Sequence, residues 1–168
     1  MDLSIVTYHP KYDQALIQME QAIVQGKAIK MKIIKKHFLD RAKVFNKYHA
    51  LLAVDTKDNP VGTCIGAATR LVINGTSFNA GIGYDVKVSA AYRNQGIARK
   101  FASPMYQQFF SPEGLTRSFV TLKQSNIPVI RLLSKTVSNI CLYDFVYLTI
   151  PCTTRIKNGH TVEGNKPL

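Results

Sequence analysis

A polar loop that leads into a helix holds the side chains with the clearest chemical meaning in this chain of 168 residues. Residues 84–100 read Y-D-V-K-V-S-A-A-Y-R-N-Q-G-I-A-R-K, which predicts a strand, a polar loop at Ala90–Gly96 and a helix that begins near Ile97. The first turn of a helix has backbone amides with no partner inside the helix, and it carries partial positive charge. A diphosphate group is therefore a natural ligand for this loop.

Two further features favour an anion site over an ordinary helix start that happens to contain a glycine. Gly96 has no side chain to hinder the approach of a phosphate to the backbone, and the small Ala98 lets the helix pack close to the strand. Arg93, Arg99 and Lys100 add positive charge nearby, and arginine can bind two phosphate oxygens at once. We therefore interpret the loop as a binding site for an anionic ligand.

The elements around this loop follow the order β-α-α-β-β-β-α-β-α-β. Apolar runs between turn residues predict six strands, at Leu3–Tyr8, His49–Asp55, Val61–Ile73, Phe78–Val88, Ser118–Lys123 and Ile140–Ile150. Apolar residues at helical spacing predict four helices, after Pro10, around Ile34–Phe45, from Ile97 to Phe109 and after Ser125 or Asn126. Residues 153–168 are polar and basic, and they are interpreted as either an edge strand or a mobile tail of one domain that spans 1–168.

Local signals sharpen this arrangement. Asn74-Gly75 lies between two long strand-like runs and predicts a tight hairpin. Pro104 lies inside the third helix, where it removes a backbone donor and should kink the helix. A central meander followed by strand-helix-strand crossovers predicts an α/β fold of the α+β type, with a mixed, mostly antiparallel sheet of six to seven strands and about four helices.

Composition limits the classes of function. Hydrophobic residues make up 46% of the chain and are spread along it, as in a globular domain. The most apolar stretch, Ile140–Ile150, is too short to cross a bilayer, and the N-terminus does not resemble a signal peptide. The three cysteines lack metal-ligand spacing and are odd in number, so we expect no metal, no disulfide framework and a cytoplasmic location.

The positive charge is concentrated in one segment. The whole chain has 22 basic and 10 acidic residues, a net charge of +12, and Lys27–Lys47 alone holds eight basic residues against Asp40, a net charge of +7. This segment is either a solvated helix face or a surface that attracts an anionic partner.

The run from Val88 to Ala98, V-S-A-A-Y-R-N-Q-G-I-A, resembles the acetyl-CoA-binding signature of the GNAT (Gcn5-related) N-acetyltransferases. The order of elements on both sides also fits this family, so the resemblance covers most of the chain and implies a GNAT-like fold. It implies that the loop amides bind the pyrophosphate of coenzyme A and that the preceding strand contacts the pantetheine arm. The cofactor residues implied by the resemblance are Val86, Val88, Arg93, Asn94, Gln95, Gly96, Ile97, Ala98, Arg99 and Asn126.

Two residues are candidates for the acid and the base of the reaction. In the family, a tyrosine on the last helix is commonly proposed to protonate the leaving thiolate, and Leu133 stands at that place here. Tyr143 is a candidate substitute, and the alternative is a tyrosine packed on a strand face. Asp85 is a candidate general base, and the alternative is a carboxylate paired with a lysine such as Lys87. Strand alternation would place Asp85 on the opposite face from Tyr84 and Val86.

Two hypotheses follow. The first is an acetyl-CoA-dependent N-acetyltransferase that moves an acetyl group directly to a primary amine of a small molecule or protein, with a monomer or homodimer expected. Basic residues near the acceptor would favour an amine that also carries an anionic group. The second is a catalytically weak module of the same fold that uses residues 27–47 to bind an acidic partner or nucleic acid. No nucleic-acid motif with interleaved aromatic residues is present, so we expect no nucleic-acid partner.

Overall fold

The computed structural model describes residues 2–23, 35–122 and 126–136. All of these belong to the first of two compact units, residues 1–138, and the second unit, residues 139–168, lies outside the described part. The predicted strand at Ile140–Ile150 and the segment 153–168 therefore also lie outside it. The single domain over 1–168 stays a prediction.

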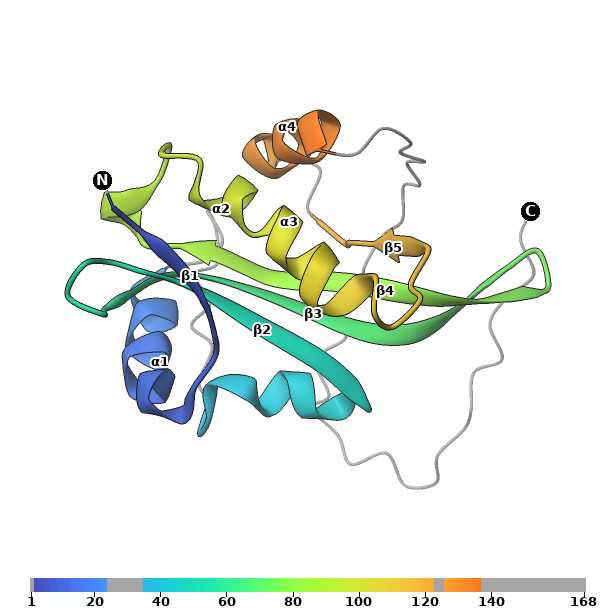
Figure 1. Cartoon of the computed structure of the whole chain (residues 1–168), viewed down its shortest axis with the longest axis horizontal. Coiled ribbons are helices and arrows are strands. Elements are labelled where there is room, and N and C mark those ends of the chain that lie inside the picture. The colour runs from blue at the N-terminus through green and yellow to red at the C-terminus, as the bar shows by residue number, and fades with distance from the viewer. Residues whose placement is uncertain (1, 24–34, 123–125, 137–168) are drawn as a thin grey trace, which may run out of the picture. The chain divides into compact units, whose positions relative to one another are not determined.

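Five strands form one sheet, in the order β1-β2-β3-β4-β5 (Figure 1). Their bounds are Ser4–Thr7 for β1, Lys47–Val54 for β2, Pro60–Ile73 for β3, Thr76–Val88 for β4 and Arg117–Phe119 for β5. The first four strands pair antiparallel, and β5 pairs parallel with β4 after a helical crossover. The prediction of a mixed, mostly antiparallel sheet is confirmed, and the described residues hold five of the six to seven strands expected.

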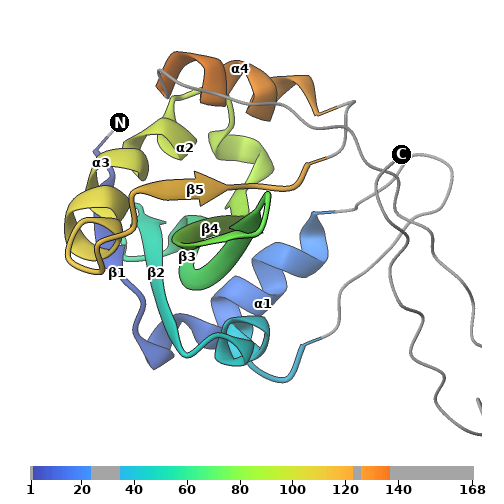
Figure 2. The same ribbon diagram turned by 90° about the vertical axis from the view of Figure 1, so that its right-hand side faces the viewer.

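Helical segments cover both faces of the sheet (Figures 1 and 2). On one face lie the 3₁₀ turn η1 (Pro10–Tyr12), α1 (Asp13–Ala22) and the 3₁₀ segment η2 (Phe38–Val44). On the other face lie α2 (Ile97–Lys100), α3 (Ala102–Met105) and the π-helix η4 (Tyr106–Phe110), and α4 (Ile127–Thr136) packs beside α2. A short 3₁₀ turn, η3 (Ala90–Tyr92), follows β4.

Each face of the sheet has its own hydrophobic core. Leu52 packs with Leu16 and Phe38 on the face of α1, and the preceding residue Leu51 packs with Phe101 on the face of α2 and α3. Successive residues of a strand point to opposite faces, which is why neighbours along β2 belong to different cores. The sheet is thereby held between two helical layers, and β4 is the strand that leads into the loop before α2.

The Asn74-Gly75 hairpin is confirmed. β3 ends at Ile73 and β4 begins at Thr76, and the two turn residues have φ values of 49° and 76°. Two consecutive positive φ values are what a two-residue type I′ turn requires, and asparagine and glycine tolerate them best. The turn sets the register of the β3–β4 pair from the hairpin as far as Ile65 and Tyr84.

Two helices differ from the prediction. The expected helix at Ile34–Phe45 is a 3₁₀ segment of seven residues, which begins after a capping contact of 2.9 Å from the backbone N–H of His37 to Asp40 and ends before the extended Phe45. The third helix is divided: α2 ends four residues before Pro104, and the π-helix η4 follows α3. The ring of a proline hinders the carbonyl four residues earlier, so the break lies where sterics predict it.

A β-bulge interrupts the pairing of β3 with β4 at Asp85. The register shifts between Thr63 and Ile65, and Asp85 has a φ of 49°. The Thr63 hydroxyl donates to the carbonyl oxygen of Asp85 at 2.7 Å, which fixes the bulged residue. Tyr84 and Asp85 consequently both contact Arg41. The expectation that Asp85 faces away from Tyr84 is therefore wrong, because the extra residue cancels the alternation.

Candidate functional site

The loop between β4 and α2 turns sharply at two residues with positive φ. Asn94 has a φ of 62° and Gly96 a φ of 73°, and Arg93 before them is extended. The carbonyl of Gly96 accepts hydrogen bonds from the amides of Arg99 and Lys100 at 3.1 and 3.2 Å, so α2 begins directly after the glycine. Ile97, only 2% exposed, anchors this helix start in the core.

Four consecutive backbone amides of this loop are available to a ligand. Within the described residues, no hydrogen bond is donated by the amides of Gln95, Gly96, Ile97 and Ala98, which we call the amide cradle. A Cβ atom built on Gly96 would meet no atom within 4 Å, so a side chain there would project into open space above the backbone. The cradle thus combines free donors with room for an anion, as the sequence predicts.

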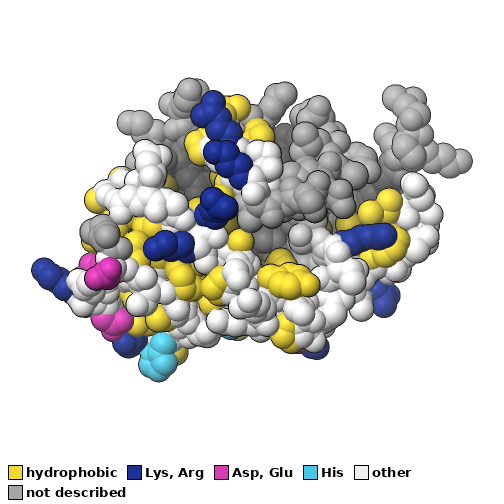
Figure 3. Space-filling view, turned by 45° about the horizontal axis from the view of Figure 1, so that its top comes forward, with side chains coloured by type: hydrophobic (Ala, Val, Ile, Leu, Met, Phe, Trp, Pro, Cys, Tyr) yellow, Lys and Arg dark blue, Asp and Glu magenta, His cyan; other side chains and the backbone are white. Residues whose placement is uncertain are grey.

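Basic side chains surround the cradle. Arg93, Arg99 and Lys100 are exposed, and α4 beside α2 adds the exposed Arg131 and Lys135. Figure 3 shows lysine and arginine side chains gathered in a row on this face of the molecule. The side chain of Arg93 also donates through Nε to the carbonyl of Val88 at 3.2 Å, which ties the loop entry to the end of β4.

β4 and β5 separate just before this loop. Within the described residues they pair at Ala80–Ile82, and Val120 beyond β5 still lies beside Gly83, 3.4 Å from a Cβ placed there. In the described part of the chain, no strand pairs with Gly83–Val88 on that side. Val86 is 39% exposed and Val88 is half-buried. As far as the described residues go, the end of β4 therefore has an unpaired backbone edge, which we call the open strand edge, and it runs toward the amide cradle.

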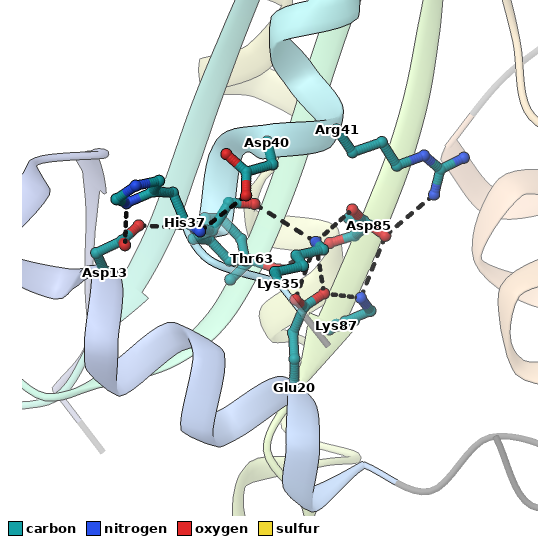
Figure 4. Close-up of polar contacts among 10 residues, drawn as sticks. Asp13, Glu20, Lys35, His37, Asp40, Arg41, Thr63, Asp85 and Lys87 are labelled. Carbon is teal, nitrogen blue, oxygen red and sulfur yellow. Dashed lines mark hydrogen bonds and ion pairs between the residues drawn. The ribbon is translucent and has the colours of Figure 1, made fainter. Parts of the chain in front are cut away.

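Behind this edge, four charged side chains form a buried cluster (Figure 4). Glu20 of α1, Lys35, Asp85 and Lys87 are each at most 10% exposed. Lys35 Nζ lies 2.9 Å from Glu20 and 3.4 Å from Asp85, and Lys87 Nζ contacts Glu20 and lies 3.2 Å from Asp85. Two carboxylates and two ammonium groups balance in charge, which is how proteins keep ionised groups away from water. We call these four residues the buried charge cluster.

The cluster controls the protonation of Asp85. Burial alone would raise the pKa of this carboxyl, but attraction to Lys87 and Lys35, a hydrogen bond from Lys87 and attraction to Arg41 together lower the pKa below its ordinary value. Arg41 approaches the same carboxylate through Nη1 at 3.4 Å. Asp85 is therefore a stable anion and a weak proton acceptor, and its contact with Lys87 is the alternative that the sequence left open.

Tyr84 contributes an unusual polar atom beside the cluster. Its residue is 8% exposed, and among the described residues its hydroxyl is the buried side-chain polar atom without a hydrogen-bond partner. Its ring packs against Phe45 with centroids 5.7 Å apart, and the Arg41 guanidinium lies 4.9 Å from the ring centroid. Burial, followed by the nearby charge of Asp85, raises the pKa of Tyr84 to about 12, so the phenol stays protonated at neutral pH.

The basic segment is less free than its sequence suggests. Within 35–47, the described part of the segment, Lys35 and Arg41 face Asp85, Lys43 pairs with Asp40 at 3.4 Å and Lys47 pairs with Glu113 at 2.5 Å. Residues 27–34 lie outside the described residues. Much of the described positive charge thus lies next to carboxylates, of which Asp85 and Glu113 are far away in sequence and Asp40 is close by.

The other residues considered for cofactor binding or catalysis lie outside the loop and the buried charge cluster. Asn126 is exposed directly before α4, and its carbonyl accepts from the amides of Val129 and Ile130 at 3.1 and 3.2 Å. Leu133 lies half-buried on α4, and Tyr143 lies outside the described residues. Cys64 is a free thiol whose pKa burial raises to about 12.

The described part of the chain holds neither a metal-binding cluster nor a membrane-spanning helix. No group of three or more His, Cys, Asp or Glu side chains there is placed to hold a metal ion. None of the helices there is long and apolar enough to span a membrane.

Sequence reasoning missed Glu20, Lys35 and Arg41 as parts of this site. Lys35 and Asp85 are 50 positions apart and Glu20 and Lys87 are 67 apart, so no local pattern joins them. One signal was present: Glu20 follows Leu16 by four residues and lies on the apolar face of α1. A charge in that position needs a buried partner.

Comparisons with known proteins find structures but no sequences. No protein-family model matches this chain, and no curated protein sequence matches it. The fold is similar to a ribosomal-protein-alanine N-acetyltransferase from Brucella melitensis biovar Abortus 2308, at 13% identity and a TM-score of 0.64 over 89% of this chain and 100% of that one. An aminoglycoside acetyltransferase from an uncultured soil metagenomic sample matches at 18% identity and a TM-score of 0.61, over 88% of this chain and 97% of that one.

Another similar structure was determined with a coenzyme-derived ligand. AAC(6')-Iy in complex with the bisubstrate analog CoA-S-monomethyl-acetylneamine matches at 11% identity and a TM-score of 0.65, over 89% of this chain and 99% of that one. Identities this low show a shared fold and nothing finer.

Proposed function

We propose that this chain, which has the fold of the GNAT N-acetyltransferases, binds acetyl-CoA and transfers the acetyl group directly to a primary amine of a small molecule, peptide or protein. The observation that carries the proposal is the amide cradle at residues 95–98, which follows the open strand edge at Gly83–Val88 after the short turn η3. In acetyl-CoA, the phosphate groups would bind to the cradle and the extended pantetheine arm would pair with the strand edge.

The residues of the loop suit the coenzyme. Free amides at Gln95–Ala98 and a glycine with open space above it match a pyrophosphate, and Arg93 and Arg99 add charge at either end. Val86 and Val88 present the open edge of β4 to the pantetheine arm, and we propose a further polar contact from Asn126. Bound acetyl-CoA supplies the thioester from which the acetyl group is taken.

The chain contributes chiefly by orientation. An edge strand holds an extended arm in one register through its backbone groups. N–H groups fixed in such a strand are donors of the kind that stabilise negative charge developing on an oxygen. Holding the amine and the acetyl group in contact contributes more to rate than any single side chain here.

The acid and base remain proposals. Asp85 is the carboxylate nearest the open part of β4, but its lowered pKa makes it a weak base. We therefore expect its contribution to lie at or below the low end of the roughly 10²- to 10⁴-fold typical of general bases. We propose Tyr143 as the proton donor to the leaving thiolate in place of the tyrosine that Leu133 replaces. A cytoplasmic monomer or homodimer is the proposed setting.

Calorimetry with acetyl-CoA tests the cofactor site. Gly96→Glu places a carboxylate in the cradle and should weaken binding by about 10- to 100-fold, because charge-assisted hydrogen bonds to the phosphates are lost. Gly75→Glu is the matched control, since Gly75 also has a positive φ of 76° and open space around its Cβ but lies at the hairpin tip.

Equal binding by the wild type and Gly96→Glu would refute the assignment of the cradle. Acetyl-CoA binding without any acetyl transfer, together with affinity for an acidic partner, would favour the catalytically weak binding module instead. The replacement of the usual tyrosine by Leu133 is the observation that keeps this second function open.

A further inference from the structure

Arg41 stands out as a positive charge that is not neutralised next to the proposed acetyl-transfer site. The buried charge cluster of Glu20, Lys35, Asp85 and Lys87 is balanced within itself. Arg41 is therefore an additional charge, and its contacts among the described residues are a long ion pair of 3.4 Å between Nη1 and Asp85 and the face of the Tyr84 ring. Its side chain is 56% exposed, so solvent and a ligand can reach it.

Tyr84 lies under this guanidinium with a polar atom that lacks a partner. The Arg41 side chain crosses its ring at 4.9 Å from the centroid, and the buried hydroxyl makes no hydrogen bond within the described residues. An unpartnered buried hydroxyl costs a protein stability, so it often marks a place completed by a ligand. Because the phenol stays protonated, the partner it lacks is best supplied by an oxygen that accepts a hydrogen bond.

We propose that Arg41 and Tyr84 together form a subsite for an anionic group, a phosphate or a carboxylate, on the amine that accepts the acetyl group. This inference rests on the proposed acetyltransferase function and adds the class of acceptor. In this subsite the exposed Arg41 guanidinium and the Tyr84 hydroxyl both donate hydrogen bonds to the anion. Asp85 and Lys35 hold the surroundings of the subsite in place. Because both take part in ion pairs of the buried charge cluster, they do not bind the anion themselves.

The position of the subsite fits a short acceptor. Tyr84 immediately precedes the bulge at Asp85, and Val86 of the open strand edge follows it, so successive Cα atoms here are about 3.8 Å apart. Coenzyme held along β4 reaches the cradle on the face of α2, whereas Arg41 and Tyr84 belong to the face of α1 and η2. The amine can therefore approach the strand edge from the face opposite the phosphates, with its anionic group only a short spacer away.

Paired acceptors test the proposal. Rates of coenzyme A release are measured with phosphoethanolamine and ethanolamine, and with glucosamine 6-phosphate and glucosamine. The wild type should prefer at least one phosphorylated member by about tenfold or more in kcat/KM, since hydrogen bonds to charged groups change binding by about 10- to 100-fold. Arg41→Gln should remove most of this preference through KM, and Tyr84→Phe should reduce it several-fold.

Controls separate the possible failures. Arg70→Gln removes the same charge from an exposed arginine of the β3–β4 hairpin and should leave the ratio of the paired rates unchanged. Arg41→Lys keeps the charge but loses the planar fork, so it should restore only part of the preference. Coenzyme calorimetry and thermal unfolding on every variant report whether the fold and the coenzyme site persist.

Three outcomes overturn the subsite. They are equal use of both members of each pair, a preference that survives Arg41→Gln, and coenzyme binding without transfer to either phosphorylated amine. Loss of acetyl-CoA binding by the wild type would instead overturn the proposed function itself, which the calorimetry detects separately.

Discussion

Replacing Asp85 by asparagine tests the buried charge cluster most directly. The change keeps the shape of the side chain and removes its charge. Lys35 and Lys87 then share only Glu20, so a balanced set of four buried groups becomes one with a net charge of +1. At the same time the bulge is kept, because Thr63 bonds to the backbone carbonyl of Asp85 and not to its side chain.

The size of the effect follows from the geometry. Removing one partner of a buried ion pair typically destabilises a protein by about 3–5 kcal/mol. The lower end applies here, since the contacts of Asp85 are 3.2 to 3.4 Å long and Glu20 remains 2.9 Å from Lys35. We expect a loss of about 3 kcal/mol in the free energy of unfolding, which lowers the melting temperature by roughly 6–12 °C in a chain of this size.

Urea unfolding at pH 7, followed by circular dichroism, provides the measurement. Lys87→Met should also be destabilising, but the double variant Asp85→Asn/Lys87→Met removes one charge of each sign and should lose less than the sum of the single variants. Asp58→Asn is the control: its ion pair with Lys11 is exposed, with both side chains 53% accessible, and it should change stability much less.

Wild-type stability in Asp85→Asn, or strictly additive losses in the double variant, would contradict the view that these four charges form one balanced unit. The same variant separates structure from catalysis. If Asp85 were the main general base, kcat would fall by about 100-fold or more even at temperatures where the variant is fully folded. We expect a smaller fall.

Two further predictions concern protonation and the unpartnered hydroxyl. The folded-state pKa of Asp85 is lowered below its ordinary value of 3.8, so its contribution to stability is fully present above that value and is lost as the pH falls through the folded pKa. Urea midpoints of the wild type should therefore drop more steeply below about pH 4 than those of Asp85→Asn. If the midpoints of both proteins fell in parallel below about pH 4, the ionised Asp85 would not contribute to stability in this way. Tyr84→Phe, measured without acceptor, should be as stable as the wild type or more stable by about 1 kcal/mol, because it removes a buried hydroxyl that has no partner. A clear loss of stability would show that this hydroxyl has a structural partner.

Local signals in the sequence were enough for much of the fold. Asn74-Gly75 specifies its turn because few other pairs tolerate two positive φ values, and Pro104 divides its helix for reasons confined to one turn. The start of α2 was predictable for the same reason, since Gly96 and the switch from a strand-like pattern to helical spacing lie within a few residues. These features depend on neighbours along the chain.

The inner part of the site could not be predicted in this way. A bulge adds one residue to a strand and leaves no mark in an apolar pattern, yet it turns Asp85 to the side of Tyr84 and Arg41. The partners of Asp85 come from positions up to 50 residues away, so they become visible only when the sheet and η2 are assembled. Local rules were therefore enough for these parts of the fold, whereas the surroundings of Asp85 depend on long-range pairing.

The basic segment shows why this difference matters for function. A count along the chain gives Lys27–Lys47 a net charge of +7, which suggests a broad surface for any polyanion. In the fold, Lys35 is buried against two carboxylates, and Lys43 and Lys47 pair with Asp40 and Glu113. Charges already matched in this way add little to the attraction for a further anion. Among the described residues of the segment, Arg41 is the one placed against both Tyr84 and Asp85 of β4, so the proposed selectivity for a small anionic amine depends on the position of this arginine more than on the total charge of the segment.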